Sequence, residues 1–236
     1  MNTPDANIES AAGLTWSLIL AIHHQLLPAV KMANTQNWNK ESIVGKELSG
    51  RTLGIIGLGR IGTRVAQIGK SLGMQVCAYD PYQEHGAFDK LQIERLSLAE
   101  LMKTSDVASL HVPLTQETEG MIHEHLLENS NRQLVLINCS RGAVVKESAL
   151  IQALENSWIA AAGLDVFEKE PLATDSRLFQ FPQILKTPHI GANTEDAFHK
   201  ASSLAAEKLV KFLFDGSTSD TLPPRAPWYG ATKAKT

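Results

Sequence analysis

The feature that most constrains the fold is a series of short, unbroken apolar runs that alternates with helix-like segments from Thr52 onward. The runs predict strands at Thr52–Gly57, Met74–Tyr79, Asp106–Val112, Leu134–Cys139, Ile159–Val166 and Ile184–Lys186. Helices are expected between them, at Arg60–Leu72, 97–103, 121–127 and Glu147–Glu155. Strands that lack polar alternation are buried on both faces, which indicates a parallel sheet covered by helices on each side.

Helices are also predicted at both ends of the chain. Residues 8–33 are apolar almost all round over Leu14–Ile22, so we expect one helix buried on more than one side. A final helix over residues 194–214 should end at Gly216 and carry one apolar stripe, formed by Phe198, Ala201, Ala205, Leu209 and Phe212. The chain then divides into a linking helix and connection (1–45), a cofactor-binding domain (46–193) and a C-terminal helix with a loose tail (194–236).

Charge and cysteine content exclude several classes of protein. The 22 Lys and Arg residues against 25 Asp and Glu give a net charge of −3, which argues against binding to nucleic acid or to a membrane surface. Cys77 and Cys139 are too few for a disulfide scaffold. The apolar stretch Ala11–Ile22 is too short to span a bilayer, and acidic residues come before any Lys or Arg, unlike a signal peptide. We expect a cytoplasmic protein.

A glycine-rich loop follows the first predicted strand. Residues Gly57–Gly62 read GLGRIG, a GxGxxG motif placed between a strand and a helix, as the motif requires. Gly57 allows a tight turn, Gly59 lets the backbone approach a pyrophosphate, and Gly62 lets the helix pack closely on the strand. The N-terminus of the helix offers free N–H groups to the phosphates.

Asp80 lies 18 residues beyond Gly62, at the end of the second strand. A carboxylate there can accept hydrogen bonds from a ribose diol and would repel a 2′-phosphate, and residues 81–85 include no Arg to hold that phosphate. The combination of strand, GxGxxG loop, helix and Asp80 predicts a Rossmann-like, doubly wound parallel sheet that binds NAD in preference to NADP.

Three further segments follow strands, where ligands bind in such sheets. They are Asn138–Gly142 (NCSRG), Gly163–Pro171 (GLDVFEKEP) and Thr187–Gly191 (TPHIG). Arg141 offers a planar fork for a carboxylate, and His189 can transfer a proton near neutral pH. Glu170 could orient the imidazole. These groups suit the reduction of a 2-oxo acid, although Arg141 or His189 taken singly would be an ordinary surface residue.

Together with His111-Val112-Pro113, these segments resemble, in order and spacing, the D-isomer-specific 2-hydroxyacid dehydrogenases. The resemblance runs from about Asn2 to about Phe214. It implies that Arg141 binds the substrate carboxylate, that His189 is the acid/base and that Glu170 pairs with it. The cofactor residues that we assign on the motifs and the resemblance are Gly57, Gly59, Arg60, Ile61, Gly62, Asp80, His111, Pro113, Thr118, Cys139, Ser140, Asp165 and Gly191, with Asp165 against the nicotinamide amide.

Two histidine clusters carry no metal prediction. His123 and His125 lie two residues apart, so on a helix they would point in different directions, and His23-His24 is no better placed.

The family resemblance also implies two domains, and the front of the substrate domain has no counterpart in this sequence. The stripe of helix 194–214 would then be exposed and would favour a partner or self-association. Helix 8–33 resembles the family's subunit-interface helix, which favours a homodimer. Two functions stay open: a dehydrogenase for a small 2-oxo or 2-hydroxy acid, alone or joined by a separate front-half polypeptide, and a non-catalytic NAD-binding or dimerisation module.

Overall fold

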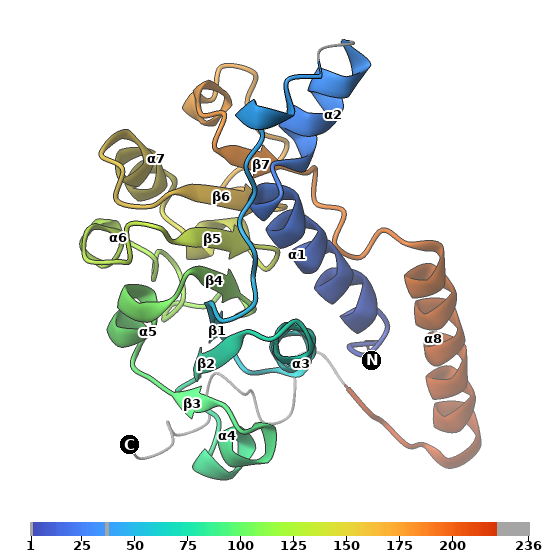
Figure 1. Cartoon of the computed structure of the whole chain (residues 1–236). Helices are drawn as coiled ribbons and strands as arrows, with labels where there is room; N and C mark the ends of the chain where they lie inside the picture. Colours follow the sequence, from blue (N-terminus) through green and yellow to red (C-terminus); the bar gives the residue numbers. More distant parts are fainter. Residues whose placement is uncertain (1, 36–37, 221–236) are drawn as a thin grey trace.

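The computed structural model describes residues 2–35 and 38–220. Its strands form one seven-stranded sheet in the order β3-β2-β1-β4-β5-β6-β7, and every pairing is parallel (Figure 1). The strands are β1 (Thr52–Ile56), β2 (Gln75–Tyr79), β3 (Glu94–Arg95), β4 (Val107–Leu110), β5 (Val135–Asn138), β6 (Ala161–Leu164) and β7 (Ile184–Lys186). The predicted Rossmann-like α/β fold is confirmed. Because Ile56 pairs with Tyr79 on one side and with Leu110 on the other, β1, β2 and β4 end level.

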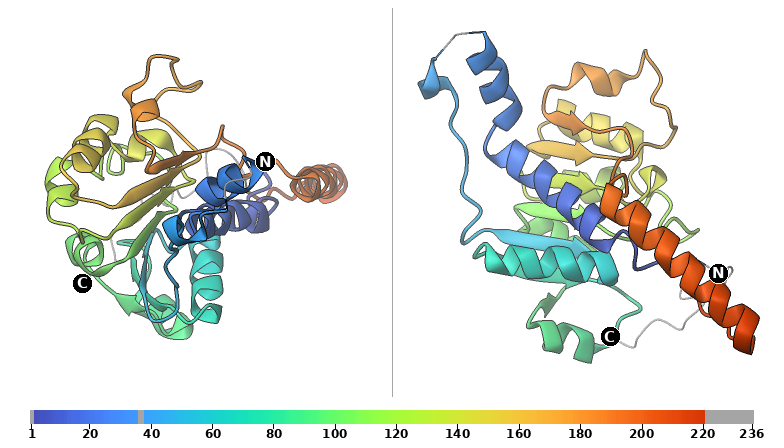
Figure 2. Two further views of the ribbon diagram at one scale, coloured as in Figure 1. Left: turned by 45° about the horizontal axis from the view of Figure 1, so that its top comes forward. Right: turned by 90° about the vertical axis from the view of Figure 1, so that its right-hand side faces the viewer.

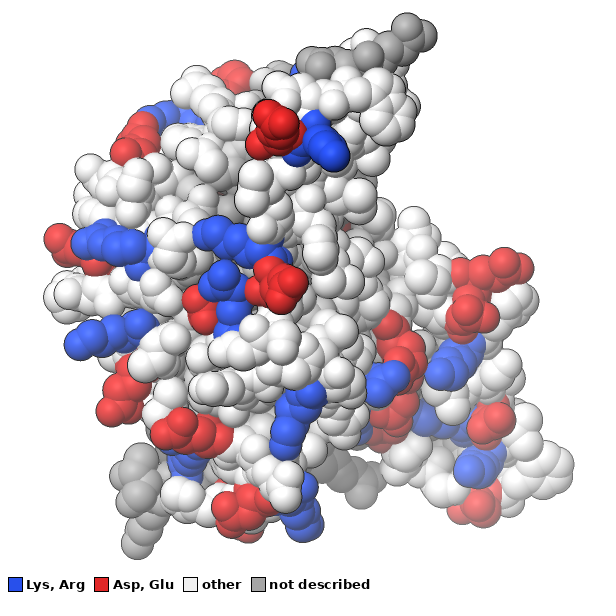
Figure 3. Space-filling model, in the orientation of Figure 1, with Lys and Arg blue, Asp and Glu red and all other residues white. Residues whose placement is uncertain are grey.

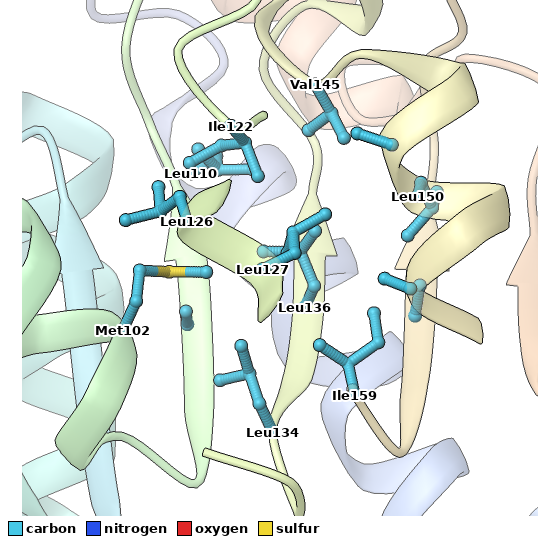
Figure 4. Packing of buried hydrophobic residues seen from close by; sticks show 14 of the residues in the cluster. Met102, Leu110, Ile122, Leu126, Leu127, Leu134, Leu136, Val145, Leu150 and Ile159 are labelled. Carbon is cyan, nitrogen blue, oxygen red and sulfur yellow. The ribbon is translucent and has the colours of Figure 1, made fainter. Parts of the chain in front are cut away.

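Helices cover both faces of the sheet (Figures 1 and 2). One face carries α1 (Ile8–His23) and α3 (Arg60–Ser71), and the other carries α5 (Leu98–Thr104), α6 (Glu124–Glu128) and α7 (Glu147–Glu155). Successive strand residues point to opposite faces, so Leu53 and Ile55 join the cluster under α1 and α3, whereas Ile56 joins the other. In that second cluster Met102, Leu127 and Leu150, one from each covering helix, surround Leu136 of β5 (Figure 4). The two clusters explain why the strands read as unbroken apolar runs.

The prediction of one helix over residues 8–33 is wrong. Helix α1 ends at His23, and α2 (Leu26–Asn34) begins after Gln25, whose backbone is left-handed with φ 50°. Pro28 gives the reason: in a continuous helix its ring would clash with the carbonyl of His24, whereas in the first turn of α2 it is tolerated. Helix α1 is largely buried, but none of the residues of α2 is.

Smaller differences concern short elements. The helix predicted over 121–127 begins only at Glu124, because Ile122 forms a parallel bridge with Val145. Helix α4 (His85–Leu91) and the two-residue strand β3 were not predicted, since both are short and α4 contains Gly86. Ser97 and Glu100 form a capping box at the start of α5, in which each side chain bonds to the backbone N–H of the other.

Helix α8 (Glu195–Asp215) stands apart from the sheet and projects from the body of the molecule (Figure 2). It ends at Gly216, with φ 70°, as predicted. Its apolar side chains are exposed, including Phe198 (61%), Leu213 (71%) and Phe214 (88%). The expected bare apolar surface is therefore present on this helix.

The far end of α8 is tied to the beginning of the chain. The Lys208 ammonium donates to the backbone O of Asn2 at 2.7 Å and to the Asp220 carboxylate at 2.5 Å, and Asn2 N–H donates to Asp220 O at 2.8 Å. The loose tail predicted for 217–236 lies outside the described residues from 221 onward. Lys and Arg alternate with Asp and Glu across the face in Figure 3, in keeping with the small net charge.

Candidate functional site

A cavity of about 980 Å³ lies beside the carboxyl ends of β1, β2 and β4. In an open parallel sheet this is the switch point, where the chain leaves β1 in one direction and later returns on its other side. Seven of the predicted cofactor residues line it: Gly57, Gly59, Arg60, Asp80, His111, Pro113 and Thr118. Tyr82 and Glu117, which the sequence analysis did not single out, also line it and are hydrogen-bonded to each other.

The glycine loop has the geometry that its spacing predicts. Gly57 has φ 96°, and a Cβ there would lie 2.8 Å from the carbonyl O of His111. A Cβ on Gly62 would lie 2.0 Å from the carbonyl O of Gly57. A Cβ on Gly59 would meet nothing within 4 Å, and Gly59 caps α3 without a side-chain hydrogen bond. The backbone at Gly59 is thus open toward the cavity, and the N–H groups that begin α3 are available to an anion such as a diphosphate.

Asp80 is fixed by the backbone around it. One carboxylate oxygen accepts from Leu58 N–H at 2.9 Å, and the other accepts from Tyr82 N–H at 2.9 Å. The first bond joins the glycine loop to the end of β2, so the acid and the loop keep one relative position. The remaining lone pairs of the carboxylate can accept from a ribose diol.

His111 and Thr118 form the wall after β4. Burial lowers the pKa of His111 to about 3, so the imidazole is neutral at pH 7, and its Nε2 lies 2.9 Å from Ser109 Oγ. The Thr118 hydroxyl donates to Pro113 O at 2.5 Å, which closes the turn over residues 113–118. Hydrogen bonds within residues 109–118 therefore fix this side of the cavity.

The other predicted cofactor residues do not line the cavity. Ile61 packs against the core under α1 and α3, and Gly62 is buried beneath the loop. Ser140 is buried, with its hydroxyl bonded to Asn138 Oδ1 at 2.8 Å. Burial raises the pKa of the Cys139 thiol to about 12, which leaves it protonated. These residues pack beneath the carboxyl ends of the strands and do not face the cavity.

His189 and Glu170 come together although 19 residues separate them. His189 Nδ1 lies 2.6 Å from Glu170 Oε2, and Glu170 Oε1 accepts from Phe167 N–H at 3.0 Å. Partial burial acts to raise the pKa of Glu170, but the hydrogen bonds from His189 and from Phe167 N–H outweigh it, so the pKa is lowered. The carboxylate is therefore ionised near neutral pH and holds Nδ1 of the imidazole, which leaves Nε2 for proton transfer.

Arg141 lies near this pair. Its charge contributes to the lowered pKa of Glu170, and its Nη1 donates to Ser140 O at 2.6 Å. The loop that carries it is pressed against the loop of Glu170, because a Cβ on Gly142 would fall 1.9 Å from the carbonyl carbon of Phe167. The Gly of the NCSRG segment is thus required by backbone packing.

Asp165 anchors the loop that carries His189. It is 1% exposed, and it accepts from the Thr187 hydroxyl at 2.6 Å, from Ile190 N–H at 2.9 Å and from Gly191 N–H at 2.8 Å. These donors flank His189 in sequence, and His189 itself has φ 55°. This anchoring role was not predicted, because the position of Asp165 within GLDV does not reveal it; the expected contact was with the nicotinamide amide.

Metal and membrane sites were also sought. Residues 2–35 and 38–220 contain no group of three or more His, Cys, Asp and Glu side chains placed to hold a metal ion. Over the same ranges, no helix combines the length and apolar character needed to cross a membrane.

Comparison with known proteins places these features in a family. The model of the D-isomer specific 2-hydroxyacid dehydrogenase NAD-binding domain matches residues 16–191. A D-3-phosphoglycerate dehydrogenase of Bacillus subtilis is 36% identical over 212 residues, which cover 90% of this chain and 40% of that protein. A glyoxylate reductase of Aeropyrum pernix is 39% identical over 218 residues, which cover 89% of this chain and 65% of that protein. The chain thus spans less than two thirds of either relative.

A crystal structure of D-lactate dehydrogenase from Aquifex aeolicus, complexed with NAD and lactic acid, superposes with a TM-score of 0.81 at 34% identity. The superposition covers 90% of this chain and 68% of that one. The residues that match the family model include both the cavity at the switch point and the loops of Arg141, Glu170 and His189. The chain therefore belongs to the D-isomer specific 2-hydroxyacid dehydrogenases, and it carries their NAD-binding domain.

Proposed function

We propose that the chain supplies the cofactor-binding and proton-transfer groups of an NAD-dependent dehydrogenase that interconverts a D-2-hydroxy acid and a 2-oxo acid. The observation that carries this proposal is the 2.6 Å contact between His189 and Glu170, with the charge of Arg141 acting on the same carboxylate. A histidine oriented by an ionised acid is the usual arrangement for general acid–base work.

The cofactor part of the proposal depends on the glycine loop and Asp80. The open backbone at Gly59 and the N-terminus of α3 would hold the diphosphate, and Asp80 would bind the ribose and repel a 2′-phosphate. NADH, when bound, supplies the hydride for reduction of the substrate.

Two side chains would then act on a 2-oxo acid. The guanidinium of Arg141 binds its carboxylate and polarises the neighbouring carbonyl. After hydride addition at C2, the imidazolium of His189 donates a proton from Nε2 to the new alkoxide, while Glu170 stabilises the imidazolium before transfer. In the reverse direction the neutral imidazole takes the proton of the 2-hydroxyl group.

The test is an NADH fluorescence titration, followed in the same cuvette by a mixture of 2-oxo acids that includes glyoxylate, hydroxypyruvate and pyruvate. We expect NADH to bind and then to be consumed. The His189→Ala variant should bind NADH normally but turn over at least about 100-fold more slowly, because it lacks the proton donor. The control is His199→Ala, which removes an exposed histidine on α8. A full rate in His189→Ala would contradict the role of His189.

A second candidate is a non-catalytic NAD-binding or dimerisation module that needs a partner for activity. The exposed apolar face of α8 favours it. Binding of NADH without consumption would support this candidate. Its partners would be a second copy of the chain, docked through α1 and α2, or a separate polypeptide that supplies a substrate domain.

A further inference from the structure

The cationic side chains of the cavity are already engaged by acids. Among the described residues that line it, the Lys and Arg side chains are Arg60 and Arg64. Arg60 Nε lies 2.7 Å from Asp5 Oδ1, and Arg64 Nε lies 2.9 Å from Glu9 Oε1. The two arginines are four residues apart on α3. Asp5 lies in the turn before α1 and Glu9 in the first turn of α1, so two parallel ion pairs join α3 to this part of the chain.

Arg60 occupies the more sensitive of the two positions. It is the first residue of α3, directly after Gly59, where the backbone is open and the helix end favours negative charge. A diphosphate bound there would meet both the free N–H groups and the guanidinium. Arg64 lies one helical turn, about 6 Å, farther along α3.

The segment that presents Asp5 is held in place from both sides. Asn2 is bonded to Lys208 and Asp220, and Ala6 N–H donates to Thr3 O at 3.1 Å. Asp220 adds negative charge on the same side: after its hydrogen bond from Lys208, the charge of Arg60 is among the causes that lower its pKa. The Asp5 carboxylate therefore competes for Arg60 from a fixed position.

We infer that Asp5 lowers the affinity of the cavity for diphosphate-bearing ligands, because its carboxylate and the diphosphate compete for the guanidinium of Arg60. The inference rests on the proposed function, since the ligand in question is the dinucleotide. Both side chains of the pair are 57% exposed, so water screens the pair and an incoming diphosphate can displace it. Without a diphosphate, the Asp5 carboxylate is the negative charge that pairs with the guanidinium of Arg60.

The experiment compares NADH dissociation constants of the wild-type chain, Asp5→Asn, Glu9→Gln, Arg60→Gln and the double variant Asp5→Asn/Arg60→Gln. Asp5→Asn should bind NADH about two- to fivefold more tightly, the range expected for release of an exposed ion pair. Glu9→Gln removes one negative charge from the Arg64–Glu9 pair and should change the NADH dissociation constant less than Asp5→Asn does. Adenosine, which lacks phosphate, should bind Asp5→Asn and Glu9→Gln like the wild type. In the Arg60→Gln background the gain should disappear.

Three results would overturn the inference while NADH still binds the wild-type chain. These are an unchanged constant in Asp5→Asn, an equal gain in Glu9→Gln, and a gain that persists without Arg60. If NADH binds neither the wild-type chain nor any variant, the proposed function fails as well. Thermal unfolding of each variant, which we expect to match the wild type because the pair is exposed, separates these outcomes from misfolding.

Discussion

At the scale of single residues, Asp165 shows how a buried carboxylate fixes the backbone around a histidine in a neighbouring loop. Its hydrogen bonds from Thr187, Ile190 and Gly191 hold the backbone on both sides of His189. The φ of 55° at His189 is unfavourable for a residue with a Cβ, and the flanking bonds offset that cost. The imidazole consequently meets Glu170 in a set direction.

Gly59 and Gly62 of the glycine loop should respond differently to the same added methyl group. Gly59→Ala should fold normally, because its Cβ meets nothing within 4 Å, but the methyl group projects where a phosphate would approach. We expect NADH binding to weaken roughly fivefold, as for the loss of one hydrogen bond. Gly62→Ala should lower the free energy of unfolding by about 1–3 kcal/mol, because its Cβ would lie 2.0 Å from the carbonyl O of Gly57.

Urea unfolding and NADH titration of both variants check this prediction. Each variant is the control for the other, because the chemical change is identical. Loss of stability in Gly59→Ala, or normal stability in Gly62→Ala, would contradict the geometry of the loop.

The role of a residue is predicted best from the sequence where that role requires a particular backbone conformation. The spacing of Gly57, Gly59 and Gly62 carries their functions, and the structure has the conformations that the spacing requires. The pairing of Asp5 with Arg60 has no such local pattern: it depends on how α1 lies against α3. Long-range contacts between exposed side chains are therefore the part that the sequence does not predict.

At the scale of elements, α8 differs from every helix that covers the sheet. Of its residues only Ala197 is buried, while Leu209, Val210, Leu213 and Phe214 are more than half exposed. A helix with this much bare apolar surface is stabilised by contact with another surface.

We therefore expect concentration-dependent association through α8. Leu213→Glu/Phe214→Glu should lower the mass of the species seen by light scattering or sedimentation velocity, because two charges would have to be buried in the contact. Leu27→Glu, at an exposed position of α2, is the matched variant on the other candidate surface. A decrease only in Leu27→Glu would assign the contact to α2, and a monomer at all concentrations in the wild type would contradict both surfaces.

Element boundaries followed from the sequence where a cap or a periodic pattern marked them. Ser97 with Glu100 marks the start of α5, and Gly216 marks the end of α8. The break after His23 was missed because apolar residues resume at Leu26 after only three polar ones, although Pro28 was a signal for it. Hydrophobic pattern alone thus overestimates the length of a helix that changes direction.

At the scale of the whole molecule, burial of neutral histidine should make stability depend on pH. An unfolded chain takes up a proton on His111 near pH 6.5, whereas the folded chain does so only near pH 3. As pH falls from 6.5 toward 3, the unfolded state binds more protons, so the unfolding free energy decreases. His23, whose pKa is lowered chiefly by desolvation, acts in the same direction.

His111→Gln should flatten this dependence in urea unfolding measured between pH 7 and pH 4. The amide of Gln takes up no proton over this pH range, so the variant loses the difference in proton uptake between the unfolded and folded chain. The exposed His125→Gln variant should keep the wild-type slope. An unchanged slope in His111→Gln would show that the imidazole is protonated in the folded chain.

The sheet itself followed from the sequence because the central strands β4, β5 and β6 are buried at every residue, as a parallel α/β arrangement requires. The edge strand β3 escaped prediction since it pairs through only two residues, Glu94 and Arg95, on one side.

The contact at Gly142 has a consequence for how such a site can change over generations. Its Cα is packed against the backbone of Phe167 and Glu168, so the loop of Arg141 cannot shift without moving the loop of Glu170. A substitution that moves the backbone beside Arg141 would therefore also displace Glu170, which contacts His189. During evolution the two loops would have to change together, whereas substitutions outside them leave the spacing of these three side chains unchanged.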